Sequence, residues 1–224
     1  MTPTAEDDEP DLAAGHASGA GYDLGRLYAF SDGVFAIAIT ILVLGIPVPS
    51  VADPTQLPGE LRHLSLNLVG FALSFVLVGT QWIAHHRLLR RLDFCTGTIM
   101  WINLLVLMGI CLVPFATSLL VRYGGTAAGA IPYAILQASI GIMFVLYRLY
   151  LVRHGVDLGG TLVLSWIPAL AFVLSIPLAL VNVNYSYAVW VAGLTISRAV
   201  SRGLGTSLLG RLRRLDLPWT RSPS

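Results

Sequence analysis

The sequence predicts an all-α integral membrane protein with six transmembrane helices. Of its 224 residues, 55% are hydrophobic and only 12% are charged, whereas a soluble domain carries about 25% charged residues. The apolar residues fall into six segments, each close to the ~20 residues that a spanning helix needs. Basic residues gather in alternate loops between these segments. These three observations place the chain in the membrane class with an even number of spans.

The six segments follow the apolar runs in order. They cover about residues 26–46, 61–84, 96–121, 130–152, 161–181 and 185–200. The first segment ends at Pro47, which cannot donate a helical hydrogen bond. Only Asn182-Val183-Asn184 separates the fifth segment from the sixth. This polar break predicts a tight hairpin rather than one overlong helix.

The first segment, RLYAFSDGVFAIAITILVLGI, is long enough to span a membrane but carries a carboxylate. As an α-helix of about 21 residues it would extend roughly 31 Å. Asp32 lies inside this run, directly after Phe30 and Ser31. A carboxylate at membrane depth is costly, and it almost always faces a protein interior or a water-filled path. The first segment is therefore the main candidate for the functional helix.

The loops differ in charge, and this difference predicts the orientation of the helices. The loop after the second segment carries Arg87, Arg90 and Arg91, and the loop after the fourth carries Arg148 and Arg153. The C-terminal end is also rich in arginine, whereas the remaining loops carry few basic residues. By the positive-inside rule, both termini lie in the cytoplasm and the protein is a multi-pass protein of the cell inner (plasma) membrane.

The two ends of the chain differ in composition from its apolar body. Residues 1–25 are acidic and of low complexity, which predicts a disordered cytoplasmic arm. Residues 26–204 form the predicted six-helix transmembrane domain, and residues 205–224 form a basic cytoplasmic tail.

Several function classes find no support in the sequence. The net charge is only +2, which gives no indication of a nucleic-acid partner. Cys95 and Cys111 lie in or beside apolar segments and lack the spacing of a metal site or disulfide framework. His85 and His86 have no further ligands at metal-binding spacing, so a capping or hydrogen-bonding role is preferred. No catalytic or nucleotide-binding motif occurs, so the sequence predicts neither an enzyme nor a cofactor.

The polar positions of the first segment match a known pattern. The run Arg26-Leu-Tyr-Ala-Phe30-Ser31-Asp32 resembles the R-x-x-x-F-S-D signature of the transmembrane protein 175 family, the lysosomal and bacterial potassium channels. The following residues resemble the rest of that family's first helix. In the next two segments the resemblance is carried by Ser74-Phe75, Trp82, His85, Asn103 and Pro114-Phe115. It covers about residues 26–121, whereas the last three segments are similar mainly in number and hydropathy.

The resemblance implies a potassium-permeable cation channel without the TVGYG filter of ordinary potassium channels. The chain would be one six-helix subunit of a homotetramer in membrane lipid, with the first helix of each subunit lining the pore. The resemblance places the constriction at apolar rings that begin at Ile37 and continue through Thr40, Ile41 and Leu44. Potassium ions are the expected permeating partner, with no resident metal. Gly45 stands where many relatives carry an acidic residue, which argues against a carboxylate ring at the outer mouth.

Helix geometry agrees with this stripe. Positions 37, 40, 41 and 44 follow the spacing i, i+3, i+4, i+7 and therefore share one helix face. At ~100° per residue, Asp32 lies about 140° away from Ile37, so we expect Asp32 to be structural rather than pore-lining. Asp32 would hold the first helix against the next two through Ser31, Trp82, His85 and Asn103. Because the helix is apolar on nearly every face, periodicity alone leaves packing open as the role of Ile37.

Two other functions stay open at this point. A proton-coupled secondary transporter would use Asp32 and His85 as a proton relay. Transporters of this kind usually have broken helices and repeated halves, and neither is evident in the sequence. A membrane scaffold without transport activity would show no ion flux when the pure protein is placed in liposomes.

Overall fold

The computed structural model describes residues 23–50, 53–93, 95–156, 158 and 163–214. Within these residues the regular secondary structure is helical throughout. The helices, in chain order, are α1 (Leu24–Ile41), η1 (Leu42–Gly45), η2 (Pro54–Gln56), α2 (Leu57–His63), α3 (Ser65–Leu89), α4 (Gly97–Tyr123), α5 (Ala127–Arg153), α6 (Val163–Val181) and α7 (Val183–Arg214). The predicted acidic arm falls almost entirely on residues outside the described ranges.

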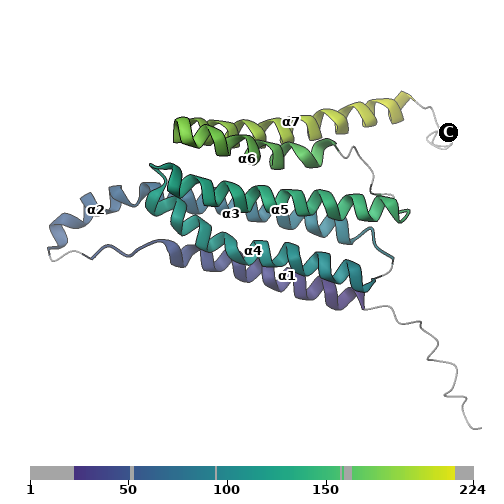
Figure 1. Cartoon of the computed structure of the whole chain (residues 1–224), viewed down its shortest axis with the longest axis horizontal. Helices are drawn as coiled ribbons and strands as arrows, with labels where there is room; N and C mark the ends of the chain where they lie inside the picture. Colours follow the sequence, from purple (N-terminus) through teal and green to yellow (C-terminus); the bar gives the residue numbers. More distant parts are fainter. Residues whose placement is uncertain (1–22, 51–52, 94, 157, 159–162, 215–224) are drawn as a thin grey trace, which may run out of the picture.

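The six longer α-helices form a bundle of roughly parallel and antiparallel rods (Figure 1). α1 and α4 lie on one side, α3 and α5 lie in the middle, and α6 and α7 lie on the other side. α1 packs on α3 and α4. α5 packs on both α4 and α6, and it therefore joins this group to the α6–α7 pair. α1 begins and α7 ends at the same end of the bundle (Figure 1). The predicted all-α fold with six long helices is therefore confirmed.

Helix length and composition agree with a membrane protein. In the described residues, four helices are long and apolar enough to cross a membrane, namely Leu24–Gly45, Asn67–Leu89, Gly97–Tyr123 and Ala127–Arg153. α6 adds a shorter apolar stretch, Trp166–Val181. α7 has 32 residues, which at ~1.5 Å each exceed the thickness of a hydrocarbon core.

The hairpin between α6 and α7 is confirmed by side-chain hydrogen bonds across it. Trp190 Nε1 donates to Ser175 Oγ over 2.7 Å, and Ser186 Oγ donates to the Ser175 carbonyl over 2.8 Å. At Gly193, a Cβ atom would come within 2.4 Å of the Ala171 Cβ. Glycine at this position therefore allows the two helices to approach closely, as small residues do in membrane bundles.

Two element boundaries differ from the sequence-based segments. The second segment is predicted from residue 61, but α3 begins at Ser65 and is preceded by the short helix α2. Before α2, Asp53 begins the 3-10 turn η2, because its carboxylate accepts a hydrogen bond from the Thr55 amide over 2.9 Å, and this bond also lowers the pKa of Asp53. The sixth segment is predicted to end near residue 200, but α7 continues to Arg214. The apolar run predicts where a span leaves the membrane, but it does not indicate where the helix itself ends.

Candidate functional site: the exposed face of α1 and its supports

One face of α1 is buried against its neighbours in the bundle. The buried residues recur every three or four positions and are Leu27, Ser31, Phe35, Ala38 and, at the start of η1, Leu42. Phe35, Ala38 and Leu42 belong to a core cluster that also contains Val78 of α3 and Ile110 of α4. This spacing places all five side chains on one helical face, and their burial fixes the rotation of α1 in the subunit.

The opposite face of α1 is exposed in the single subunit. Ile37 is 59% exposed, and Thr40, Ile41 and Leu44 are exposed on the same side. The last turn tightens to a 3-10 helix, η1. In a 3-10 helix residues three apart lie above one another, so Ile41 and Leu44 stay aligned at the end of the stripe. All four residues predicted to line a pore thus share a face of α1 that is left exposed by the described residues of the subunit.

Thr40 has a specific geometry on this face. Its Oγ1 donates a hydrogen bond to the Ile37 carbonyl over 2.8 Å. Because the hydroxyl proton is engaged with the backbone, the remaining lone pairs of the oxygen are available to an electron-poor ligand on the exposed side.

A buried chain of hydrogen bonds holds α1 to α4 and α3. Ser31 Oγ donates to the Leu27 carbonyl over 2.8 Å, and Asn103 Nδ2 donates to Ser31 Oγ over 3.0 Å. His85 Nε2 lies 2.7 Å from Asn103 Oδ1. Since that oxygen can only accept, Nε2 carries the proton and the donors run in one direction, from His85 through Asn103 and Ser31 to the backbone. Ser31, His85 and Asn103 are all buried.

Asp32 takes part in a separate contact at the edge of this region. Trp82 Nε1 donates to Asp32 Oδ1 over 2.8 Å, and the Trp82 ring lies 5.7 Å from the His86 ring. Asp32 is half-buried, and Trp82 is 38% exposed. The structure therefore divides the predicted supports into two groups, one fully buried and one at the surface of the subunit.

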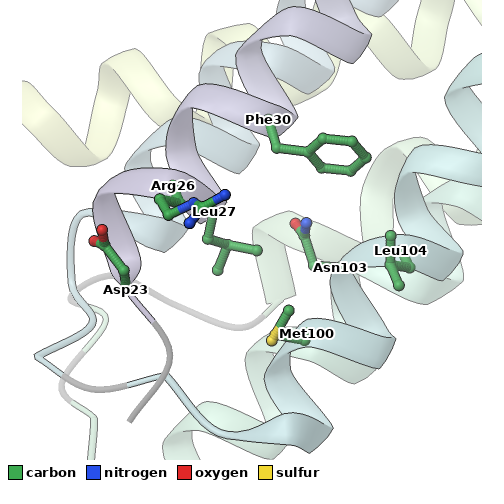
Figure 2. Close-up of a pocket in the computed structure, with 7 residues that line it drawn as sticks. All are labelled: Asp23, Arg26, Leu27, Phe30, Met100, Asn103 and Leu104. Atoms are coloured by element: carbon green, nitrogen blue, oxygen red, sulfur yellow. The ribbon is translucent and has the colours of Figure 1, made fainter.

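Arg26 and Phe30 lie at a cavity next to the buried chain. The cavity is about 530 Å³ and lies between the first turns of α1 and α4. Figure 2 shows its lining residues, which are Asp23, Arg26, Leu27, Phe30, Met100, Asn103 and Leu104. Asn103 is thus shared between the cavity wall and the hydrogen-bonded chain. Arg26 and Phe30 belong to neither hydrogen-bonded group in the described contacts.

Other features of the sequence receive a plain structural explanation. A Cβ at Gly45 would lie 3.1 Å from Ser118 Oγ of α4, so a larger residue there would have to displace that side chain. Among the described residues, no group of three or more His, Cys, Asp or Glu side chains is placed to hold a metal ion. Cys95 is buried and Cys111 is exposed, and both are free thiols.

Sequence reasoning missed a second set of buried polar contacts between α3, α4 and α5. Thr117 Oγ1 donates to Ser74 Oγ over 2.8 Å, and Ser74 Oγ lies 3.0 Å from the Tyr133 hydroxyl. About two turns further along α3 from Ser74, Gln81 Nε2 donates to Gln137 Oε1 over 2.8 Å. The available signal was the spacing of Ser74, Gln81 and His85 along one face of α3, at i, i+7 and i+11.

The chain is similar to known proteins in both sequence and fold. A family model described as "Endosomal/lysosomal potassium channel TMEM175" matches residues 26–114. A potassium channel of Streptomyces collinus is 34% identical over 135 residues, which cover 58% of this chain and 66% of that protein. The endosomal/lysosomal proton channel TMEM175 of Gallus gallus is 25% identical over 146 residues, which cover 63% of this chain and 28% of that protein. The chain thus matches just under two thirds of the length of the bacterial relative.

The fold is similar to a solved structure over nearly all of that structure's length. The crystal structure of a lysosomal potassium-selective channel TMEM175 homolog from Chamaesiphon minutus superposes with a TM-score of 0.69 and 30% sequence identity. The match covers 79% of this chain and 97% of that one. The similarity extends beyond the residues of the family model and includes helices that lie C-terminal to α4.

Proposed function

Since the chain belongs to the TMEM175 family, we propose that it forms a potassium-permeable cation channel whose pore is lined by α1 of each of four identical subunits. The observation that carries this proposal is the uncovered stripe of Ile37, Thr40, Ile41 and Leu44 on α1. The stripe lies within the matched residues, and the opposite face of α1 is fixed by packing. Four such faces around one axis would enclose a narrow path.

Ile37 is proposed to form the constriction, with Ile41 and Leu44 as further rings on the outer side. A ring of aliphatic side chains offers a permeating ion no ligand, and narrow hydrophobic rings gate by dewetting. The ion that loses its hydration shell more easily then crosses more readily, and K⁺ is more weakly hydrated than Na⁺. Thr40 supports this role, because its hydroxyl oxygen can contact a partly dehydrated cation while its proton stays on the Ile37 carbonyl.

The signature residues are proposed to position α1 rather than to contact ions. Ser31, Asn103 and His85 form the buried chain behind the helix, and Asp32 accepts the Trp82 indole proton beside it. A rigid support on this side keeps the exposed stripe at a constant rotation, and a small rotation of α1 would move every ring at once. Ion sorting by shape and size needs such preorganisation.

We further propose that the channel lies in the plasma membrane with both termini in the cytoplasm. α1 begins and α7 ends at one end of the bundle (Figure 1). Arg87, Arg90, Arg91 and Arg153, at the last turns or ends of α3 and α5, are exposed. An excess of arginine on one side of a helical bundle is typical of the cytoplasmic side.

The test is ion flux through the pure protein, reconstituted in liposomes or planar bilayers, with Ile37→Asn as the main variant. We expect wild-type currents that reverse near the potassium equilibrium potential. Ile37→Asn should raise conductance and lower the preference for K⁺ over Na⁺, because an amide ring wets the constriction. Bi-ionic reversal potentials measure that preference directly.

Ile135→Asn is a matched control for this variant. Ile135 lies on α5 and is 50% exposed, which is close to the exposure of Ile37. The Ile135→Asn substitution introduces the same amide on a different helix, and it should leave conductance and reversal potential unchanged. If Ile37→Asn has wild-type reversal potentials, Ile37 does not form the selective ring.

A proton-coupled transporter based on Asp32 and His85 is the second candidate, and the same preparation distinguishes it. A channel current reverses at the potassium equilibrium potential whatever the pH gradient, whereas a coupled transporter shifts its reversal potential when the pH gradient changes. The position of His85 argues against a relay, since its Nε2 proton is engaged with Asn103 inside the subunit. A scaffold without transport would give no flux at all.

A further inference from the structure

Two glutamine side chains meet in the interior of the subunit, between α3 and α5. Gln81 Nε2 donates to Gln137 Oε1 over 2.8 Å. Gln137 is only 1% exposed, and Gln81 is half-buried. Gln137 lies near the middle of α5 (Ala127–Arg153), so this contact is far from both membrane surfaces. Lipid cannot satisfy polar groups at this depth, and each one needs a partner inside the protein.

The contact leaves two amide atoms without a partner. Gln81 Oε1 and Gln137 Nε2 are buried and have no hydrogen-bond partner among the described residues. This result does not depend on how the two amide groups are oriented. Turning both amides exchanges the donor and the acceptor of the bond between the two glutamines. Turning only one of them would place two carbonyl oxygens or two amide nitrogens against each other. In either arrangement, one carbonyl oxygen and one amide nitrogen stay outside the bond between the two glutamines, and the Tyr133 hydroxyl beside Gln137 is bonded to Ser74.

We propose that each subunit binds a water molecule at this place, donating to the free carbonyl oxygen of one glutamine and accepting from the free amide of the other. The chemistry of the two unpaired atoms selects this ligand. A metal cation would be repelled by the amide proton, and an anion would be repelled by the carbonyl oxygen. Water is both donor and acceptor, and buried waters typically bridge otherwise unsatisfied groups of this kind.

The packing of α3 and α5 supports the site. In the described part of the chain, α3 makes most of its close backbone contacts with α1 and α4, and α5 makes most of its own with α4 and α6. α3 and α5 meet through side chains that reach across, by apolar packing at Leu77 and by hydrogen bonds at Ser74–Tyr133 and Gln81–Gln137. Such wider spacing is compatible with the small space, about 10–15 Å³, that one water needs.

The bound water has a clear structural role. α3 belongs to the group that supports α1, whereas α5 leads to the α6–α7 hairpin. Together, the two amides and the water form a polar link between these two parts of the subunit. The site is independent of the proposed channel function, because it involves none of the exposed residues of α1.

The test uses the full chain in lipid bilayers, labelled with ¹⁵N only in glutamine side chains. The sequence contains three glutamines, Gln56, Gln81 and Gln137. Water-edited solid-state NMR detects transfer of magnetisation from water protons to each amide. Gln56 is exposed in η2 and provides the positive control. We expect the Gln137 amide to gain water magnetisation at short mixing times, with an intensity comparable with that of Gln56.

Assignment comes from single substitutions, each of which removes one of the three signals. Gln137→Met assigns the key signal directly, and Gln56→Met at the exposed site serves if the former folds poorly. Trp190, whose Nε1 donates to Ser175 Oγ and which is 1% exposed, provides a buried negative control after tryptophan labelling. If Gln56 gains water magnetisation while the Gln137 and Gln81 amides stay as dry as the Trp190 indole, the water site does not exist.

Discussion

Two of the buried polar groups that link helices in this subunit differ in how completely their atoms are paired. The first runs from His85 through Asn103 to Ser31 and ends on a backbone carbonyl of α1. The second is the Gln81–Gln137 pair between α3 and α5, which leaves an acceptor and a donor free. The first group is closed by the protein alone, whereas the second is completed by the water we infer.

This difference in pairing predicts where the subunit tolerates substitution. In the closed chain, removing the central Asn103 leaves His85 without its partner in an apolar interior, while Ser31 keeps its bond to the Leu27 carbonyl. In the glutamine pair a mobile ligand can follow whichever polar atom is left. We therefore expect the support of α1 to be sensitive to substitution and the α3–α5 link to be tolerant.

The largest effect is expected for Asn103→Leu. This substitution keeps the size of the side chain but leaves the Ser31 hydroxyl and the His85 ring without their shared partner. Ser31 keeps its bond to the Leu27 carbonyl, but the His85 donor is left unpaired in the interior, which should lower the free energy of unfolding by about 1–3 kcal/mol. Thermal or denaturant unfolding of the purified protein in detergent measures the change. Gln137→Leu is the matched amide-to-leucine control, and an equal loss in both variants would erase the distinction between the two groups.

A smaller effect is expected for Trp82→Phe, which tests the contact at the edge of the first group. The phenylalanine ring retains most of the packing but cannot donate to Asp32. The loss of one partly exposed hydrogen bond should cost about 0.5–1.5 kcal/mol.

Trp101→Phe provides the control for this change. Trp101 is 69% exposed, against 38% for Trp82, and makes none of the described hydrogen bonds. The Trp101→Phe variant should lower the free energy of unfolding by less than the Trp82→Phe variant does. A larger loss at Trp101 would mean that ring packing, rather than the Asp32 contact, accounts for both values.

The contrast between the two polar groups also explains what the sequence could predict. The all-α class, the number of long helices and the α6–α7 hairpin follow from composition, apolar runs and one polar break, all of which are local properties. Ser31, His85 and Asn103 were predicted together because the family resemblance singled them out. Helical spacing alone places Ser31 on one face of α1 but names none of its partners.

The Gln81–Gln137 contact could not be predicted in the same way. The two residues are 56 positions apart, and each is a single amide in an apolar helix with no motif around it. Their meeting depends on how α3 and α5 are rotated, which is set by the packing of the whole bundle. The rotation of α1 raised the same difficulty, because a helix that is apolar on nearly every face does not specify which face is buried.

The smallest effect is expected from a double-mutant cycle on the glutamine pair, and it is also the most informative about the comparison. Gln81→Met and Gln137→Met should each cost about 0.6 kcal/mol, the average for a side-chain hydrogen bond between membrane helices, because the amide that stays behind keeps its water. The double variant removes both polar groups and the need for the water, so its stability should return to near that of the wild type. A double variant whose loss equals the sum of the two single losses would show that the amides do not act as a unit. In that case the second group would be a pair of independent contacts, and the bond between Ser74 and Tyr133 would carry the polar link from α3 to α5 in the described part of the chain.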